Sequence, residues 1–262
     1  MAIDVKSISQ LISEFRKLQT KDSITPESLG YILQRLADLL ATAGTSETVA
    51  NIQKFLDRRK PGQSRYTTAR KEGDLVEILS GVFEGKTTGT PISLMVRNTD
   101  QRSRDYGNIA YSYRPGHADY TFDQKYGFRD YRGGGRSSGR ETIGRVAAGA
   151  IASKILEELG ISICTYTRSI GPVEIASFNK EEIHQNAFYM PDAQAAVKAG
   201  EYLEECMKNQ DSAGGVIECR ITGTPAGLGE PVFDKLSALL AHALMSIGAV
   251  KAVEIGDGIA VT

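Results

Sequence analysis

The stretch Arg132-Gly133-Gly134-Gly135-Arg136-Ser137-Ser138-Gly139-Arg140 leads directly into the clearest helix signal of the sequence. Its three consecutive glycines let the backbone approach a ligand closely and adopt positive φ angles. Ser138 and Glu141 have the spacing of a capping box, with Ser138 as the cap. A helix N-terminus offers unpaired N–H groups and a positive dipole end, so the stretch predicts an anion site. The alternative is a Gly-rich connection with exposed arginines.

The elements around this stretch predict a fold that mixes helices and strands. The capped helix is expected to run to Gly160, because its apolar series ends there at a residue suited to helix termination. Apolar patterning between turn residues predicts strands at 91–96, 161–167, 215–223 and 250–255, and helices at 192–208 and 232–247. Residues 76–85 are predicted as a strand followed by a Gly-marked turn. This order of elements indicates an α/β or α+β sandwich. Residues 97–139 show little periodicity, and an ordered segment of that length usually carries function.

The first fifty residues carry only helix signals. Apolar residues from Ile8 to Leu18 have helical spacing, and Thr25-Pro26-Glu27-Ser28 is typical of a helix start, with a stop near Gly44. Thr45 begins a third predicted helix, which ends before Pro61-Gly62. We therefore expect residues 1–50 to form a helical segment and residues 51–262 to form the domain that carries the binding site.

The composition is that of an ordinary globular protein, with 41% apolar and 24% charged residues. The net charge of −1 argues against a nucleic-acid or membrane partner. We expect no membrane span and no export, because the sequence has neither a long apolar run nor a signal-peptide core. Cys164, Cys206 and Cys219 are odd in number and widely spaced, which predicts reduced thiols and a cytoplasmic location.

The charge distribution is more informative than the sum. Nine arginines and one lysine lie between Arg97 and Arg145, against six acidic residues. Arginine pairs phosphate and carboxylate groups with two parallel hydrogen bonds, so this bias favours a site for a multiply anionic small molecule. The alternative is a solvated surface with salt bridges. We expect Asp119, Asp123 and Asp130 to neutralise arginines rather than bind a metal.

His117 is the candidate for proton transfer, in the turn Arg114-Pro115-Gly116-His117-Ala118-Asp119. An imidazole can donate or accept a proton near neutral pH. A single histidine is more often structural, but this one lies in a Pro-Gly turn within the basic segment. His184 and His242 have no comparable setting.

Several longer motifs resemble the chorismate synthase family across residues 55–259. They are Asp57-Arg58-Arg59-Lys60-Pro61-Gly62, Ser64-Arg65-Tyr66-Thr67-Thr68, Leu79-Ser80-Gly81-Val82-Phe83-Glu84-Gly85, Asn98-Thr99-Asp100-Gln101-Arg102-Ser103, Arg114-Pro115-Gly116-His117-Ala118-Asp119-Tyr120-Thr121, Asp130-Tyr131-Arg132-Gly133-Gly134-Gly135-Arg136-Ser137-Ser138 and Ala226-Gly227-Leu228-Gly229-Glu230-Pro231. The resemblance implies a homotetrameric flavoprotein lyase with a β-α-β sandwich core. It also implies reduced FMN as cofactor, NADPH as a possible reductant of the flavin, and a place in the shikimate pathway of aromatic amino acid biosynthesis. The implied reaction is the anti-1,4-elimination of phosphate from 5-enolpyruvylshikimate 3-phosphate, giving chorismate.

The resemblance also assigns roles to individual residues. His117 matches a family histidine that acts as a proton donor near the flavin. The expected cofactor-binding residues are Arg59, Arg65, Arg136, Ser137, Ser138, Gly248 and Ala249. The expected substrate-binding residues are Arg59, Arg65, Arg114 and Arg140. Gly248 stands where the family has asparagine, which removes one side-chain hydrogen bond to the flavin.

The helical segment 1–50 is expected to be unrelated to the family, because none of its residues match the family motifs. Two parts of the family pattern also have no counterpart in this sequence: an initial Gly-Glu-Ser-His-Gly motif with a second catalytic histidine, and a C-terminal region with a catalytic aspartate. We therefore expect weak or no turnover. One alternative function is that of an impaired remnant of the enzyme that still binds flavin and anions. The other is an interaction module in which the N-terminal helices bind a partner.

Overall fold

The computed structural model describes residues 45–67, 72–84, 86–98, 107, 109–132 and 138–261. The two helices predicted before residue 45 lie outside the described residues, as do Arg136 and Ser137. The chain divides into two compact units. Unit 1 comprises Met1–Thr99 and Val146–Arg220, and unit 2 comprises Asp100–Arg145 and Ile221–Thr262.

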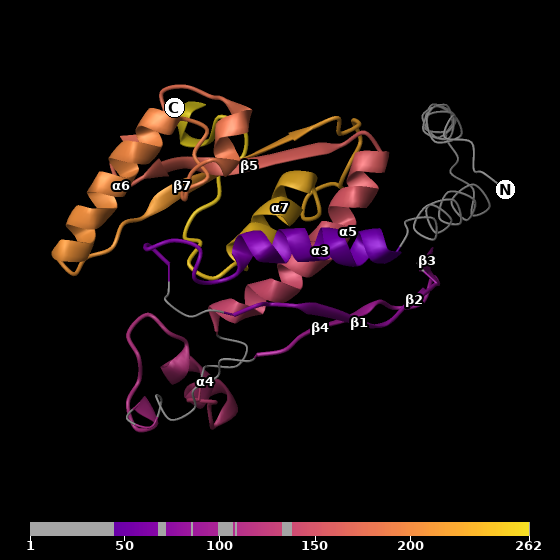
Figure 1. Cartoon of the computed structure of the whole chain (residues 1–262), viewed down its shortest axis with the longest axis horizontal. Helices are drawn as coiled ribbons and strands as arrows, with labels where there is room; N and C mark the ends of the chain where they lie inside the picture. The colour runs from indigo at the N-terminus through magenta and orange to yellow at the C-terminus, as the bar shows by residue number, and fades with distance from the viewer. Residues whose placement is uncertain are drawn as a thin grey trace. The chain divides into compact units, whose positions relative to one another are not determined.

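The helices and strands of unit 1 follow the predicted order (Figure 1). They are α3 (Thr45–Arg59), β1 (Val76–Ser80), β2 (Val82–Phe83), β3 (Lys86–Thr87), β4 (Ser93–Val96), α5 (Thr142–Glu158), β5 (Ser162–Ile170), β6 (Val173–Glu174), the 3₁₀ helix η4 (Lys180–His184), α6 (Ala193–Lys208) and β7 (Gly215–Thr222). The first residues of α5 and the last of β7 belong to unit 2. The short strands β3 and β6 were not predicted.

The side chain of Gln53 in helix α3 forms hydrogen bonds to the backbone at the start of strand β1. Gln53 Nε2 donates to the carbonyl of Asp74 at 3.3 Å, and Gln53 Oε1 accepts from the N–H of Val76 at 3.1 Å. Ile52 and Leu56, on the same helix, are fully buried. Strand β1 then runs antiparallel to β4, with Val76 opposite Val96 (Figure 1). The helix start predicted at Thr45 is confirmed.

Gly81 divides residues 76–85, which were predicted as a strand followed by a Gly-marked turn, into the two strands β1 and β2. Its φ angle is 82°, and a Cβ atom there would lie 2.7 Å from both Ile92 Cα and the carbonyl oxygen of Pro91. Only glycine accepts this conformation and this close approach without strain. The chain therefore turns after β1, and β2 pairs antiparallel with β3 instead of extending β1.

The second half of unit 1 is a three-stranded sheet, in the order β6-β5-β7, packed against helix α6. Strands β5 and β6 form an antiparallel hairpin with Ile170 opposite Val173. The core beneath the helix consists of Met190, Ala195, Ala196 and Ala199, with Ile170, Val173, Ile175 and Phe188 packed around them. The alanines on this face of α6 let the helix approach the sheet closely, because they have no bulk beyond Cβ.

Asp192 begins α6 and ties it to the chain that precedes it. Its carboxylate accepts from the N–H groups of Gln194 and Ala195 in the helix and of Ala176 and Ser177 upstream, each at 3.0 Å. The hydrogen bond from Ala195 is the largest of the effects that lower the pKa of Asp192 to about 2, against the opposing effect of burial. The helix predicted over 192–208 is confirmed.

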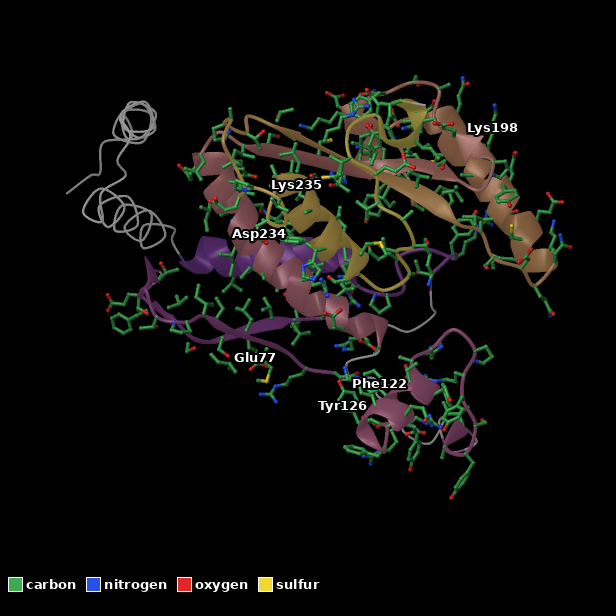
Figure 2. All side chains as sticks on the ribbon, turned by 180° about the vertical axis from the view of Figure 1, so that it is seen from behind. Glu77, Phe122, Tyr126, Lys198, Asp234 and Lys235 are labelled. Carbon is green, nitrogen blue, oxygen red and sulfur yellow. The ribbon has the colours of Figure 1, made fainter. Side chains whose placement is uncertain are left out.

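Unit 2 contains α4 (Asp119–Tyr126), the 3₁₀ turn η3 (Gly139–Glu141), α7 (Leu236–Met245) and the 3₁₀ turn η5 (Gly258–Val261). Helix α4 lies in the segment 97–139, where the sequence shows little periodicity and no helix was predicted. Phe122 and Tyr126, one turn apart on α4, stack edge to face at 5.3 Å (Figure 2). The next residue, Gly127, ends the helix in a left-handed conformation.

Two predictions for the C-terminal part need correction. The helix predicted over 232–247 begins only at Leu236, because the chain before it folds back: Glu230 N–H donates to the Asp234 carbonyl at 2.9 Å. The strand predicted over 250–255 is wrong, since those residues form no strand. A β-type composition makes a strand only where a neighbouring strand supplies hydrogen bonds.

Among the described helices, none combines the length and the apolar character that a membrane span requires. Within the same ranges, no three His, Cys, Asp or Glu side chains gather as metal ligands would. The three cysteines are free thiols, of which Cys206 is buried and Cys219 is exposed.

Candidate active site

The start of helix α5 has the predicted cap. Ser138 has an extended backbone, and its Oγ accepts from the N–H of Arg140 at 3.3 Å. The first turn is the 3₁₀ turn η3, and α5 follows it directly. The Glu141 carboxylate accepts from Arg145 Nε at 3.1 Å, so this side chain supports the next turn of the helix. Helix α5 ends at Glu158, and the predicted stop at Gly160 is confirmed by its left-handed φ of 75°.

Arg145 connects this helix start to the turn that follows α7. Arg145 Nη1 donates to Ser246 Oγ at 2.8 Å, and Nη2 donates to the Ser246 carbonyl at 3.2 Å. Gly248 and Ala249 come just after this contact, and both are exposed. Ala249 has a φ of 72°, which is unusual for a residue with a Cβ atom. Two segments predicted to bind flavin, at Ser138 and at Gly248-Ala249, are thus linked within unit 2.

His117 lies exposed in a tight turn just before α4. Its N–H donates to the carbonyl of Arg114 at 3.2 Å, and its ring Nδ1 lies 3.2 Å from the carbonyl oxygen of Pro115. A carbonyl oxygen can only accept, so this contact requires the proton on Nδ1. In the neutral ring Nε2 then holds the lone pair, and in the charged ring it holds a proton that can be donated.

Asp119 binds Arg114 across this turn. Its carboxylate accepts from the Arg114 backbone N–H at 3.0 Å, from Nε at 2.9 Å and from Nη2 at 2.9 Å. The side chain of Asp119 is only 2% exposed. The side-chain hydrogen bonds from Arg114 are the main reason that the pKa of Asp119 lies well below its usual range. Arg114, predicted as a substrate ligand, thus directs these donors into the fold.

Arg129 was not singled out from the sequence, yet it organises this part of unit 2. Its Nε lies 3.4 Å from Asp123 Oδ2, its Nη1 lies 3.6 Å from Asp119 Oδ2, and its side chain is 6% exposed. Its Nη2 donates to three main-chain carbonyls, those of Ile109 at 2.8 Å, Ala110 at 3.1 Å and Ser112 at 2.9 Å. Nothing in the sequence distinguishes Arg129 from its neighbours, because its role depends on where the chain folds back.

The prediction that nearby aspartates neutralise arginines is confirmed. Asp119 pairs with Arg114 and Arg129, and Asp123 pairs with Arg129. Asp130 Oδ1 lies 3.8 Å from Arg132 Nε and accepts a hydrogen bond from the backbone N–H of Arg132 at 3.0 Å.

The basic stretch 57–66, which was predicted as a loop and is called the basic loop below, lies in unit 1. Its first three residues belong to α3, and both of its candidate arginines contact acids that are distant in sequence. Arg59 Nη1 lies 2.8 Å from Asp74 Oδ2, and the Asp74 side chain is fully buried. Arg65 is 69% exposed and pairs with Glu204 of α6. Its Nη2 also donates to the hydroxyl of Tyr66 at 2.8 Å. Sequence reasoning did not find Asp74 or Glu204, because no local pattern links them to the loop.

The start of α5 and the turn after α7 contain described residues to which the motifs assign the cofactor. Exposed small residues at Gly248-Ala249 leave the backbone accessible. At the helix start, the N–H groups of Arg140 and Glu141 are already bonded to the hydroxyl and the carbonyl of Ser138. Arg140 adds a half-buried side chain at the same helix start. An accessible backbone beside an arginine is compatible with a phosphate-bearing ligand.

Together these features define a protein of mixed helices and antiparallel sheets, with arginines paired to acids in the stretch 57–66 of unit 1 and around α4 of unit 2. The chorismate synthase family model matches residues 26–262, so the chain belongs to the chorismate synthase family. The family predicted from the motifs is therefore confirmed. The match begins at residue 26, inside the segment 1–50 that was predicted to be unrelated to the family.

Curated relatives agree with this assignment. The chain is 67% identical over 218 residues to a chorismate synthase of Agathobacter rectalis, covering 82% of this chain and 59% of the relative. It is 60% identical over 244 residues to one of Lachnospira eligens, covering 92% of this chain and 65% of the relative. A crystal structure of a chorismate synthase matches with a TM-score of 0.65 and 32% identity, over 81% of this chain and 62% of the other. The chain thus spans less than two thirds of the length of these relatives.

Proposed function

We propose that this chain acts in the chorismate synthase reaction, the anti-1,4-elimination of phosphate from 5-enolpyruvylshikimate 3-phosphate to give chorismate. The observation that carries the proposal is the family match over residues 26–262, with identities of 60–67% to enzymes of that name. In this reaction a C–O bond to phosphate and a C–H bond break, and a conjugated diene forms.

The proposed flavin site joins the start of α5 to the turn after α7. Arg136, Ser137 and Ser138 from the Gly-rich loop would hold reduced FMN together with Gly248 and Ala249. The Arg145–Ser246 hydrogen bonds support this proposal, because they tie the two segments together. Reduced FMN, when bound, supplies electron density that helps phosphate to leave without a net redox change.

The proposed proton-transfer group is His117, through Nε2. The hydrogen bond between Nδ1 and Pro115 supports this role, since it fixes the tautomer and orients the ring. Arg59, Arg65 and Arg140 are proposed to bind the phosphate and carboxylate groups of the substrate, for which the paired donors of arginine are suited. For Arg114, the contacts with Asp119 favour a role in the fold over direct substrate binding. NADPH is the proposed source of electrons for the flavin.

We also propose the assembly and setting implied by the family. These are a β-α-β sandwich core, a homotetramer and a cytoplasmic location. The boundary near residue 51, with a separate helical segment before it, stays a prediction.

The proposal is tested by flavin titration and phosphate release with the purified chain. We expect FMN to bind, and slow phosphate release to require both reduced FMN and substrate. Oxidised FMN under air is the matched control and should give no release. Flavin binding without any phosphate release would contradict the elimination and assign the chain a binding role only. Absence of flavin binding would contradict both functions.

A further inference from the structure

The turn that carries His117 is closed by a single carboxylate. Asp119 is the first residue of α4, and Arg114 is the last residue before the turn. The three hydrogen bonds from Arg114 to the Asp119 carboxylate span the turn, with donor–acceptor distances of 2.9–3.0 Å. Because one of these donors is the Arg114 backbone N–H, the carboxylate fixes the main chain as well as the side chain.

A second arginine holds the same carboxylate from the other side. Arg129 Nη1 lies 3.6 Å from Asp119 Oδ2, and Arg129 also binds the carbonyls of Ile109, Ala110 and Ser112. The segment that leads into the turn is therefore fixed to the same buried group. Two arginines and two aspartates, Arg114, Arg129, Asp119 and Asp123, form this ionic cluster, and their formal charges cancel.

The cluster does not touch the imidazole directly, and its effect on His117 passes through the backbone. The carbonyls that His117 contacts belong to Arg114, whose own N–H is fixed by Asp119, and to the next residue, Pro115. If Arg114 moved, both carbonyls would move with it, and the Nδ1 contact that sets the tautomer would be lost. The ring is exposed, so packing gives it little other restraint.

We propose that Asp119 is a positioning residue for His117, holding the turn Arg114–Ala118 so that Nε2 is oriented for proton transfer near the flavin. This inference rests on the proposed function for its chemical consequence. Its structural part, a fixed ring with the proton on Nδ1, stands independently of turnover. Arg114 is then part of the device that positions the histidine.

The test combines ¹⁵N spectra of the His117 ring with turnover and flavin affinity for Asp119→Asn. In the unmodified chain we expect a ring spectrum dominated by the Nδ1–H tautomer. In Asp119→Asn we expect the two ring nitrogens to average between tautomers, and the turnover number to fall about 10-fold or more with FMN affinity and KM changed less than about 3-fold. Glu77→Gln is the matched control, because it removes a carboxylate from the exposed Arg97 pair in unit 1 (Figure 2).

A second variant keeps the test decisive if Asp119→Asn does not fold. Arg114→Lys retains the positive charge but cannot make two parallel hydrogen bonds to one carboxylate. We expect it to fold and to show partial averaging of the His117 ring. An unchanged ring spectrum in a folded variant of either kind would overturn the proposal. Failure of the proposed function is seen separately, as absent flavin binding or phosphate release in the unmodified chain.

Discussion

The basic loop of unit 1 (residues 57–66) and the turn of unit 2 that carries His117 (residues 114–118) both pair their arginines with acids, but the acids come from different parts of the chain. In the loop, Arg59 pairs with Asp74 and Arg65 pairs with Glu204, 139 residues away. In the turn, Arg114 pairs with Asp119, only five residues away. The loop is thus anchored by tertiary structure, whereas the turn and α4 carry their own counter-charges.

This difference has a functional consequence. An exposed, distant pair such as Arg65–Glu204 exchanges easily with water, so Arg65 can leave Glu204 for an anionic ligand at little cost. A buried, local cluster holds its shape, because any broken pair leaves a charge without compensation in a poorly solvated place. We therefore expect Arg65 of the loop to bind a ligand and the turn to position His117.

The most destabilising substitution is expected in unit 2, and the same substitution in the loop serves for comparison. Arg129→Met should destabilise the segment 109–126 by about 3–5 kcal/mol, because it removes the cation from a buried pair and from three carbonyls. Arg65→Met is the matched control. Urea unfolding with hydrogen exchange over residues 109–126 measures both variants. Equal effects of the two substitutions would mean that the turn is no better fixed than the loop.

A smaller effect is expected at the helix that carries Glu204. Asp192→Ala removes the acceptor of four backbone N–H groups, two of them in the first turn of α6. We expect a loss of about 2–3 kcal/mol, because a helix cap alone contributes about 1 kcal/mol and buried donors lose their partner as well. Thermal unfolding followed by circular dichroism measures it. A loss below about 0.5 kcal/mol would show that water replaces the carboxylate.

Acid should remove the same stabilisation without a mutation. The pKa of Asp192 is lowered to about 2 in the folded chain, whereas an unfolded aspartate titrates near its ordinary value of 3.8. A group with a lowered pKa stabilises the fold above the unfolded value, and this contribution is lost as the pH falls from about 4 to about 2. The stability difference between the unmodified chain and Asp192→Asn should therefore shrink by up to about 2 kcal/mol in that window. A constant difference across it would rule out the carboxylate charge as the cause.

The smallest energy is expected for the ion pair between Arg65 and Glu204 at the loop. A double-mutant cycle with Arg65→Met and Glu204→Gln should give a coupling energy below about 1 kcal/mol, since both side chains are exposed. The coupling should also fall in high salt, because exposed charges are screened. A coupling above about 2 kcal/mol would indicate a rigid pair and would count against a ligand-binding role for Arg65.

The sequence predicted well those features that depend on neighbours along the chain. The cap at Ser138, the start of α6 at Asp192 and the stop at Gly160 are set within one helical turn, so their signals are local. The neutralisation of arginines by Asp119 and Asp123 was predictable for the same reason. The roles of His117 and of the Gly-rich loop rest on the family motifs and stay predictions.

The features that were missed depend on partners elsewhere in the chain. Helix α4 has no clear apolar periodicity, and its Asp119 and Asp123 pair with Arg129, which lies beyond its end. Residues 250–255 have the composition of a strand but no strand to pair with among the described residues. The contacts of Arg59 and Arg65 with Asp74 and Glu204 arise only when α3, β1 and α6 have folded. Sequence patterns report local preference, and tertiary contacts then decide which preferences survive.

Proton transfer by His117 is tested most directly by comparing phosphate release by His117→Asn with that by the unmodified chain, at saturating substrate and with reduced FMN. Asparagine retains a polar group of similar size but cannot transfer a proton near neutral pH. We predict that phosphate release falls by about 100-fold or more, in the range typical of a lost acid–base group, while FMN affinity is unchanged. Phosphate release at the rate of the unmodified chain would contradict the assignment of proton transfer to the turn in unit 2.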